Sequence, residues 1–292
     1  MLTIQSVGAT TKLSQHEILP AKTDVGALAN RINANTKECH DKVNKQMALK
    51  LAIALRDPKI YRQGVQSFYH VFSTIERCLN DQVNANNEWS LILKQIWKPE
   101  VARTEKCETD LLFYYDDDRK KFMNPVMPEQ IKFVNHIETV TKEKPYLLLA
   151  YMHVMYLALF AGGKVLRSSV SKATGLFPHK DGLKHEDVIK LGANMFIFDV
   201  ADESLLRMIY KRDYELLTRN NLTEAQKLDI IEESKYIFAQ NSRCISEIEK
   251  HNLVKITKKW SYIIATRGYY IAIFSLILAL LYFVRRIFLH LF

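Results

Sequence analysis

Glycine, proline and cysteine are all scarce in this chain of 292 residues, and each shortage excludes a class of protein. With only 9 Gly and 7 Pro, the chain is neither collagen-like nor dominated by loops, and helices are favoured. The four cysteines form no CxxC pair and have no regular spacing. A disulfide scaffold and a cysteine-based zinc site are therefore disfavoured, and a reducing compartment is indicated. The first 20 residues contain no apolar stretch of the signal-peptide type, so we expect no secretion.

The positive charge of the chain is concentrated near its C-terminus. The formal net charge is +9, but residues 255–292 hold six Lys and Arg and no Asp or Glu. The preceding residues therefore carry only +3 of this charge. A nearly neutral body argues against a nucleic-acid partner, because such a partner is bound through a basic surface.

The C-terminal region contains one long uncharged segment, residues 268–284, with the sequence GYYIAIFSLILALLYFV. As a helix it covers roughly 25 Å, which suits the thin bilayer of the endoplasmic reticulum. Basic residues flank both ends, and tyrosines lie where aromatic rings prefer the membrane interface. The pattern predicts a transmembrane helix, with a buried core helix as the alternative. We expect a C-terminal tail anchor in the endoplasmic reticulum membrane, in contact with membrane lipid, with the preceding domain facing the cytosol.

The body of the chain has helical periodicity throughout, without strand-type alternation and without repeats. Pro58 ends the first expected helix, which covers about 28–55. Thr223 and Gln226 have the spacing of a capping box, so a final helix is expected from there to about His251. The fold class predicted is all-α. The expected organisation is a flexible N-terminal arm (1–26), a single multi-helix domain (27–251), a basic linker (252–267), one transmembrane helix (268–284) and a short tail (285–292).

Two features of the body suggest a binding site. Gly162 and Gly163 interrupt an apolar helix expected to begin at Pro145, at a cost of roughly 2 kcal/mol relative to alanine. They indicate a kink, a C-cap or close approach of another group to the backbone, with a tight helix crossing as the alternative. His40 falls on the apolar stripe of the first helix, where it is either a core histidine or a ligand.

A third feature is the pair of basic residues Arg207 and Lys211, one helical turn apart among apolar neighbours. Such a pair can hold carboxylates, although an ordinary solvated helix face has the same pattern. Lys37, one turn before His40, has the same two interpretations.

Five segments, in this order along the chain, resemble the heme oxygenase family, specifically its membrane-anchored eukaryotic, fungal-type branch. The resemblance covers about residues 27–249. The segments are ANTKECHDKVN, GVQSFYHVFSTIERCL, PEVARTEKCETDLLFYY, PYLLLAYMHVMYLALFAGGKVL and the pair LLRMIYKRDYELL with LTEAQKLDIIEESKYIFAQNSRCI.

The resemblance implies specific roles for these residues. His40 matches the histidine that binds heme iron, and Gly162 and Gly163 match the glycines over which the macrocycle lies. Arg207 and Lys211 match the pair that holds the heme propionates. His153 matches a tyrosine near the heme edge, and the resemblance also implies heme contacts for Lys37, Phe238 and Asn241.

One position departs from the family pattern. The family usually has a glycine and then an aspartate before the Gly-Gly pair, and here these positions are Ala158 and Leu159, while Ala161 replaces a serine. The aspartate normally holds the water network that delivers protons to bound oxygen. Its replacement by leucine implies slow turnover or a peroxidase-like side reaction, and His153 is the first candidate to compensate.

The function implied is that of an enzyme, a heme oxygenase that converts heme b, dioxygen and electrons into biliverdin, ferrous iron and carbon monoxide. This reaction serves heme catabolism and iron homeostasis. Because the chain has no GxGxxG or flavin motif, the electrons are expected from NADPH through a flavoprotein cytochrome reductase of the endoplasmic reticulum. Two alternatives are a heme-binding or heme-sensing protein with weak or lost turnover, and a tail-anchored helical adaptor without a cofactor.

Overall fold

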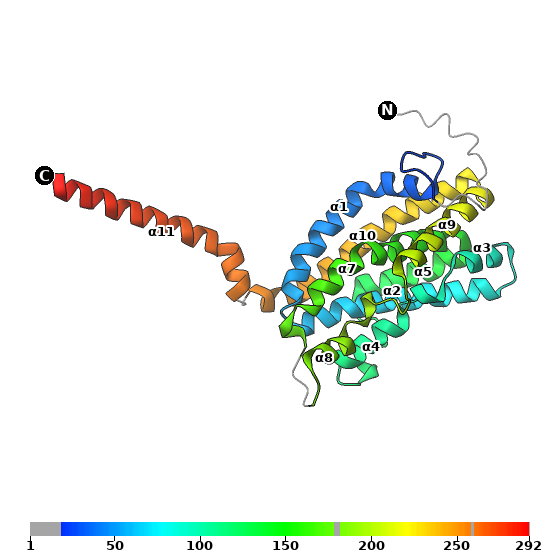
Figure 1. Cartoon of the computed structure of the whole chain (residues 1–292), viewed down its shortest axis with the longest axis horizontal. Coiled ribbons are helices and arrows are strands. Elements are labelled where there is room, and N and C mark those ends of the chain that lie inside the picture. Colours follow the sequence, from blue (N-terminus) through cyan, green and yellow to red (C-terminus); the bar gives the residue numbers. More distant parts are fainter. Residues whose placement is uncertain (1–18, 178–181, 258–259, 292) are drawn as a thin grey trace. The chain divides into compact units, whose positions relative to one another are not determined.

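The computed structural model describes residues 19–177, 182–257 and 260–291, so most of the expected N-terminal arm lies outside the described residues. The chain divides into two units, residues 1–248 and 249–292. Every regular element in the described ranges is helical, which confirms the all-α class (Figure 1).

The elements of unit 1 follow one another with short connections. The α-helices are α1 (Leu28–Ala54), α2 (Pro58–Asn84), α3 (Glu88–Ile96), α4 (Thr104–Tyr114), α5 (Pro128–Glu143), α6 (Leu148–Tyr151), α7 (Leu157–Ser171), α8 (His185–Gly192), α9 (Glu203–Asn221) and α10 (Glu224–Thr257), the last of which continues into unit 2. Five 3₁₀ turns and one π-helical turn connect them, namely η1 (Pro99–Val101), η2 (Arg119–Lys121), η3 (Pro145–Leu147), η5 (Thr174–Leu176), η6 (Asn194–Phe196) and the π-helical η4 (Met152–Tyr156).

Helix α2 forms the centre of unit 1 and packs against α1, α3, α4, α5 and α6. Its start is set locally, because Asp57 accepts a hydrogen bond from the Lys59 backbone N–H at 2.9 Å and Pro58 occupies the first helical position. Its buried face includes Phe72 and Ile75, both at most 1% exposed. At roughly 25 cal/mol per Å² of buried apolar surface, such side chains supply the main stabilisation of the bundle.

Two sequence predictions about helix ends are confirmed. Helix α1 ends before Pro58. At the start of α10, Thr223 N–H donates to Gln226 Oε1 at 2.8 Å, and Gln226 N–H donates to Thr223 Oγ1 at 3.3 Å, which completes the capping box. Pro99 begins a helical turn, although this turn is the short 3₁₀ element η1 and the α-helix starts later, at Thr104.

The apolar helix expected from Pro145 is instead a broken element. It consists of η3, α6, the π-turn η4 and α7, and the axes of its parts Pro145–Phe160 and Val165–Ser171 differ by 54°. The bend therefore falls at the Gly162-Gly163 pair. Glycine removes the side chains that would stiffen this turn, so the kink that the sequence offered as one interpretation is the observed geometry.

Unit 2 contains the end of α10 and the helix α11 (Trp260–Leu291). Its large apolar side chains from Tyr269 to Phe283 are exposed, for example Leu276 at 72%. Among the described residues, no single helix is long and apolar enough to cross a membrane, since the apolar part of α11 is limited to Arg267–Phe283. The bent pair Pro145–Phe160 and Val165–Ser171 meets the criterion by length and composition only, and it supplies core residues of unit 1.

Candidate functional site

Two tyrosines of α9 donate hydrogen bonds to backbone carbonyls in and just before the π-turn η4. Tyr210 Oη donates a hydrogen bond to the Met152 carbonyl, and Tyr214 Oη donates to the Leu149 carbonyl, each at 3.0 Å. A π-turn displaces backbone groups from the regular α-helical ladder, and these hydroxyls satisfy carbonyls that remain buried there. Helix α9 therefore fixes the shape of the segment that carries His153.

His153 projects from η4 into the space between α1 and α9. Its Nε2 lies 3.2 Å from Asn33 Oδ1 on α1, and its ring centroid is 5.4 Å from that of Tyr214 on α9. Nδ1 is buried and has no hydrogen-bond partner among the described residues. Burial, and secondarily the positive charge of Lys211, lowers the pKa of His153 to about 4. The imidazole is therefore neutral at pH 7, and its unpartnered nitrogen is available to a ligand.

Arg207 and Lys211 lie on one face of α9, as the sequence predicted. Neither forms an ion pair with a carboxylate of the described residues, whereas Arg212 and Arg219 on the same helix do. Burial lowers the pKa of Lys211, and the charges of Arg207 and Lys22 lower it further. A cluster of cations without a counter-charge is electrostatically unfavourable by itself and complementary to an anionic ligand.

His40 corrects one expectation. It was expected to follow Ile32 and Thr36, which are 0% and 2% exposed, along a buried stripe, but its side chain is 54% exposed. The helical period assigns a residue to a face, yet that face is buried only where another element covers it. An uncovered imidazole can still accept a metal, since ligation needs a free ring nitrogen.

The neighbours of His40 lie between α1, which carries this histidine, and the π-turn η4. The ring of Phe238 on α10 lies edge-on to the imidazole, with 5.8 Å between centroids, and Asn44 Nδ2 is 3.2 Å from a ring nitrogen. One turn after Phe238, Asn241 donates to the Ile237 carbonyl at 2.9 Å and to Met155 Sδ at 3.4 Å. Because Met155 belongs to η4, the predicted residues Phe238 and Asn241 do lie between the helix of His40 and the segment that leads to the glycines.

Of the glycine pair, Gly162 is partly exposed and Gly163 is buried. A Cβ built on Gly162 or Gly163 meets no other atom within 4 Å. Ala158 and Val165, which share a helix face with Gly162, are exposed, Val165 at 68%. Small or absent side chains on an uncovered face allow a flat ligand to approach the main chain.

Leu159 lies one turn before Gly163 on the same helix face and, like that glycine, is buried. It is only 7% exposed and belongs to the hydrophobic core. Lys37 is exposed on α1 and makes no hydrogen bond or ion pair with the described residues. Among the described residues, no hydrogen bond or ion pair joins Lys37 to Arg207 or Lys211.

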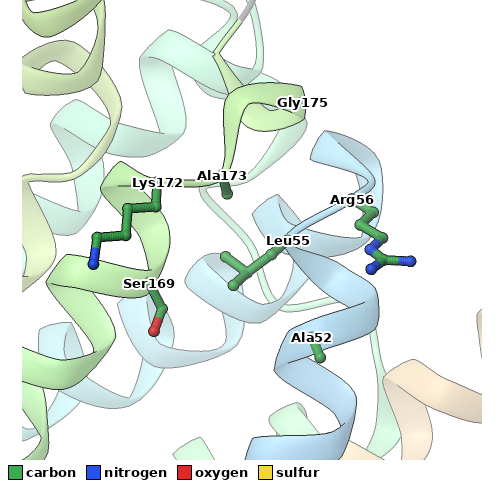
Figure 2. Close-up of a pocket in the computed structure, with 7 residues that line it drawn as sticks. All are labelled: Ala52, Leu55, Arg56, Ser169, Lys172, Ala173 and Gly175. Atoms are coloured by element: carbon green, nitrogen blue, oxygen red, sulfur yellow. The ribbon is translucent and has the colours of Figure 1, made fainter.

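A pocket of about 390 Å³ opens between the C-terminal ends of α1 and α7 (Figure 2), and His40 is not among the residues that line it. Its apolar lining comes from Ala52, Leu55 and Ala173. The charged ends of Arg56 and Lys172 point away from one another in Figure 2, so they do not form a clamp for an anion.

Sequence reasoning missed three parts of this site. Asn33 looks like an ordinary polar residue of an exposed helix face, and Lys22 lies in a segment without periodicity. The π-turn has no sequence signal of its own, although the spacing of Tyr210 and Tyr214 by four residues does indicate that both face one neighbour.

Together, the all-helical bundle and the candidate residues on α1, on the kinked segment and on α9 fit one class of protein, that of the heme oxygenase fold. The heme oxygenase family model matches residues 26–247, and the chain belongs to the heme oxygenase family. It is 40% identical over 267 residues to the heme-binding protein HMX1 of Saccharomyces cerevisiae, covering 85% of this chain and 84% of that protein.

More distant relatives extend the comparison beyond fungi. The heme oxygenase of Guillardia theta is 26% identical over 79% of this chain and 90% of its own length. The crystal structure of heme oxygenase-1 from Synechocystis in complex with heme superposes with a TM-score of 0.64 at 23% identity, covering 79% of this chain and 96% of that one. At this identity the structural match shows the fold alone.

Proposed function

We propose that this protein is a heme oxygenase that binds heme b as its substrate and opens the porphyrin ring to biliverdin, releasing ferrous iron and carbon monoxide. The observation that carries the proposal is the pair Arg207 and Lys211 on α9, which has no carboxylate partner among the described residues. The pair lies on a helix that packs against α7, and the charge of Lys211 lowers the pKa of His153 in η4. Heme has two carboxylates on one edge, and two cations one turn apart complement them.

The other residues of the site fit the same ligand. His40 has an uncovered imidazole that can bind the iron on one face. Gly162, where an added Cβ would meet nothing within 4 Å, leaves room for the macrocycle to approach the main chain. The unpartnered Nδ1 of neutral His153 can accept a hydrogen bond at the ligand edge.

Heme supplies the iron that binds dioxygen and the ring that is oxidised, and the protein supplies orientation and proton delivery. The chain contains no GxGxxG motif. We therefore propose that electrons come from NADPH through a flavoprotein reductase of the endoplasmic reticulum. We also propose that α11 anchors the protein in that membrane with the helical domain in the cytosol. The exposed apolar side chains of α11 and the basic residues Arg267, Arg285 and Arg286 support this second proposal.

A second candidate function is heme binding or sensing with weak or lost turnover. It is favoured by Leu159, because a buried leucine can neither hold a water molecule nor transfer a proton. The name of the similar yeast protein, a heme-binding protein, fits either candidate.

The test is a hemin titration of the purified protein followed by reductase-coupled turnover. We expect a histidine-ligated absorption spectrum at one hemin per chain, and then formation of biliverdin and carbon monoxide. A hemin complex that forms no biliverdin would support the second candidate, and a protein that binds no hemin would exclude both.

A further inference from the structure

One face of α9 carries four charged residues at intervals of four, Arg207, Lys211, Glu215 and Arg219. The second half of this face is neutralised, because Arg219 Nε lies 2.8 Å from Glu215 and Arg219 Nη2 lies 2.6 Å from Asp24. The first half, Arg207 and Lys211, has no such partner among the described residues. Asp24 thus attaches a segment from before α1 to the helix that carries the unpaired cations.

This segment, residues 21–26, is a fixed turn, and we refer to it as the N-terminal turn. Asn30 Nδ2 donates to the Ala21 carbonyl at 2.9 Å and to the Asp24 carbonyl at 2.8 Å. Within the turn, Gly26 N–H donates to Asp24 Oδ1 at 2.8 Å. Ala27, directly after it, is fully buried. The backbone of the turn is therefore held by α1 and its side chain Asp24 by α9.

Lys22 lies inside the N-terminal turn, two residues before Asp24, and is exposed. Its charge is close enough to contribute to the lowered pKa of Lys211, after burial and Arg207. Among the described residues Lys22 also has no carboxylate partner. The ion pair between Asp24 and Arg219 places the turn that carries Lys22 against α9, the helix of Arg207 and Lys211. An anionic ligand at this end of α9 would be attracted by cations from two separate segments.

We propose that Lys22 is a third carboxylate-binding group of the ligand site, presented by the N-terminal turn, and that it favours ligands with two carboxylates over ligands with none. The inference rests on the proposed function, because it assigns Lys22 to the same ligand. Two adjacent cations on α9 hold one edge of the ligand, and Lys22 adds a positive charge from the N-terminal turn. Lys22 therefore increases the affinity for a dicarboxylate more than the affinity for a neutral analogue.

The experiment uses the full chain and two metal-free porphyrins, protoporphyrin IX and its dimethyl ester, followed by fluorescence. Metal-free ligands make the measurement independent of iron ligation and of turnover. The variant is Lys22→Glu, and the matched control is Lys132→Glu, which reverses an exposed lysine on α5, a helix that packs against α2. We expect Lys22→Glu to weaken protoporphyrin IX binding about five- to tenfold at low ionic strength, because attraction becomes repulsion at a screened site.

The same variant should leave the dimethyl ester unaffected, and Lys132→Glu should change neither affinity. Lys22→Arg should keep wild-type affinity, which excludes an effect of the turn's conformation. Equal affinities of Lys22→Glu and Lys132→Glu for protoporphyrin IX, while the wild type binds it, would overturn the inference and leave the proposed function intact. A wild type that binds neither porphyrins nor hemin would overturn the proposed function and the inference together.

The ion pair between Asp24 and Arg219 allows a second test of the inference. Asp24→Asn removes the charge that attaches the turn to α9. If Lys22 acts from a fixed turn, Asp24→Asn should weaken protoporphyrin IX binding, and adding Lys22→Glu should cost less than it does in the wild-type background. If the two substitutions reduce the binding free energy for protoporphyrin IX additively, the turn does not position Lys22, and this result would count against the inference. Far-UV circular dichroism checks that each variant is folded.

Discussion

The imidazole of His40 is more than half exposed, and it interacts with Phe238, Asn44 and Asp41. Its exposure means that removing it leaves no cavity, so a substitution there tests ligation with little effect on folding.

We expect His40→Ala to fold normally and to lose the histidine-ligated hemin spectrum. The physical reason is that the alanine has no group that can bind iron, while the rest of the site is intact. The measurement is the absorption spectrum of the hemin complex, with added free imidazole as a control that should restore ligation. A wild-type spectrum in the variant would show that another residue is the ligand.

Unlike His40, Leu159 is buried, so a substitution there affects the stability of the fold as well as the chemistry of the site. We expect Leu159→Asp, alone or with Ala158→Gly, to raise the biliverdin yield per electron consumed and to reduce peroxide release. A carboxylate can hold a water molecule that a leucine cannot. Its burial should lower the unfolding free energy by on the order of 2 kcal/mol.

Biliverdin and hydrogen peroxide are measured together in reductase-coupled turnover, with thermal unfolding in parallel. Leu159→Asn is the control for polarity without charge. If the wild type already converts hemin stoichiometrically with little peroxide and the variant gains nothing, the missing aspartate is compensated elsewhere, and His153 is the next residue to test.

At the scale of the elements, a substitution in the kinked segment should change the stability of the protein and its affinity for hemin in opposite directions. We expect Gly162→Ala to raise the unfolding free energy by up to about 1 kcal/mol, because alanine favours helix and its Cβ meets nothing within 4 Å. We expect the same change to weaken hemin binding, because the added methyl occupies the open face.

The matched control is Gly64→Ala on α2, where a Cβ also meets nothing within 4 Å. This variant should gain similar stability and keep wild-type hemin affinity. Equal hemin affinity in both variants would show that the ligand does not approach the backbone at Gly162. Chemical denaturation and hemin titration measure the two effects.

Helix α9 acts as a unit through its basic face. We expect the double variant Arg207→Glu and Lys211→Glu to weaken hemin binding by about 2 kcal/mol, or roughly thirtyfold, since attraction of the propionates becomes repulsion. The control is the double reversal Lys132→Glu and Lys142→Glu on α5, which changes the net charge equally. Unchanged hemin affinity in a folded α9 variant would remove these residues from the site.

At the scale of the whole molecule, the hydrophobic core ends before unit 2 begins. Its C-terminal members are Ile237, Cys244 and Ile248, whereas the apolar side chains of α11 are exposed. We expect truncation before Gly268 to give a soluble, folded domain that binds hemin as the full chain does. Membrane sedimentation, circular dichroism and hemin titration measure this. A truncated protein that still sediments with membranes, or that does not fold, would show that α11 has a different role.

The sequence by itself determined the helical class, the chemistry of the candidate residues and several helix ends. Asp57 with Pro58, and Thr223 with Gln226, act within one turn of backbone, so local spacing is enough to place them. The Gly162-Gly163 pair likewise marked the bend, because the cost of glycine in a helix is a local property.

Only the tertiary structure decided which of these residues are covered and which meet. His40 and Thr36 share a face of α1, yet one is exposed and the other buried, because coverage depends on neighbouring helices. The hydroxyls of Tyr210 and Tyr214 on α9 donate hydrogen bonds across the bundle to the carbonyls of Met152 in the π-turn and of Leu149 just before it. The turn that carries Lys22 lies against α9 because Asp24 binds Arg219, which lies 195 residues further along the chain. Contacts over such separations depend on packing of the whole domain, and no local pattern encodes them.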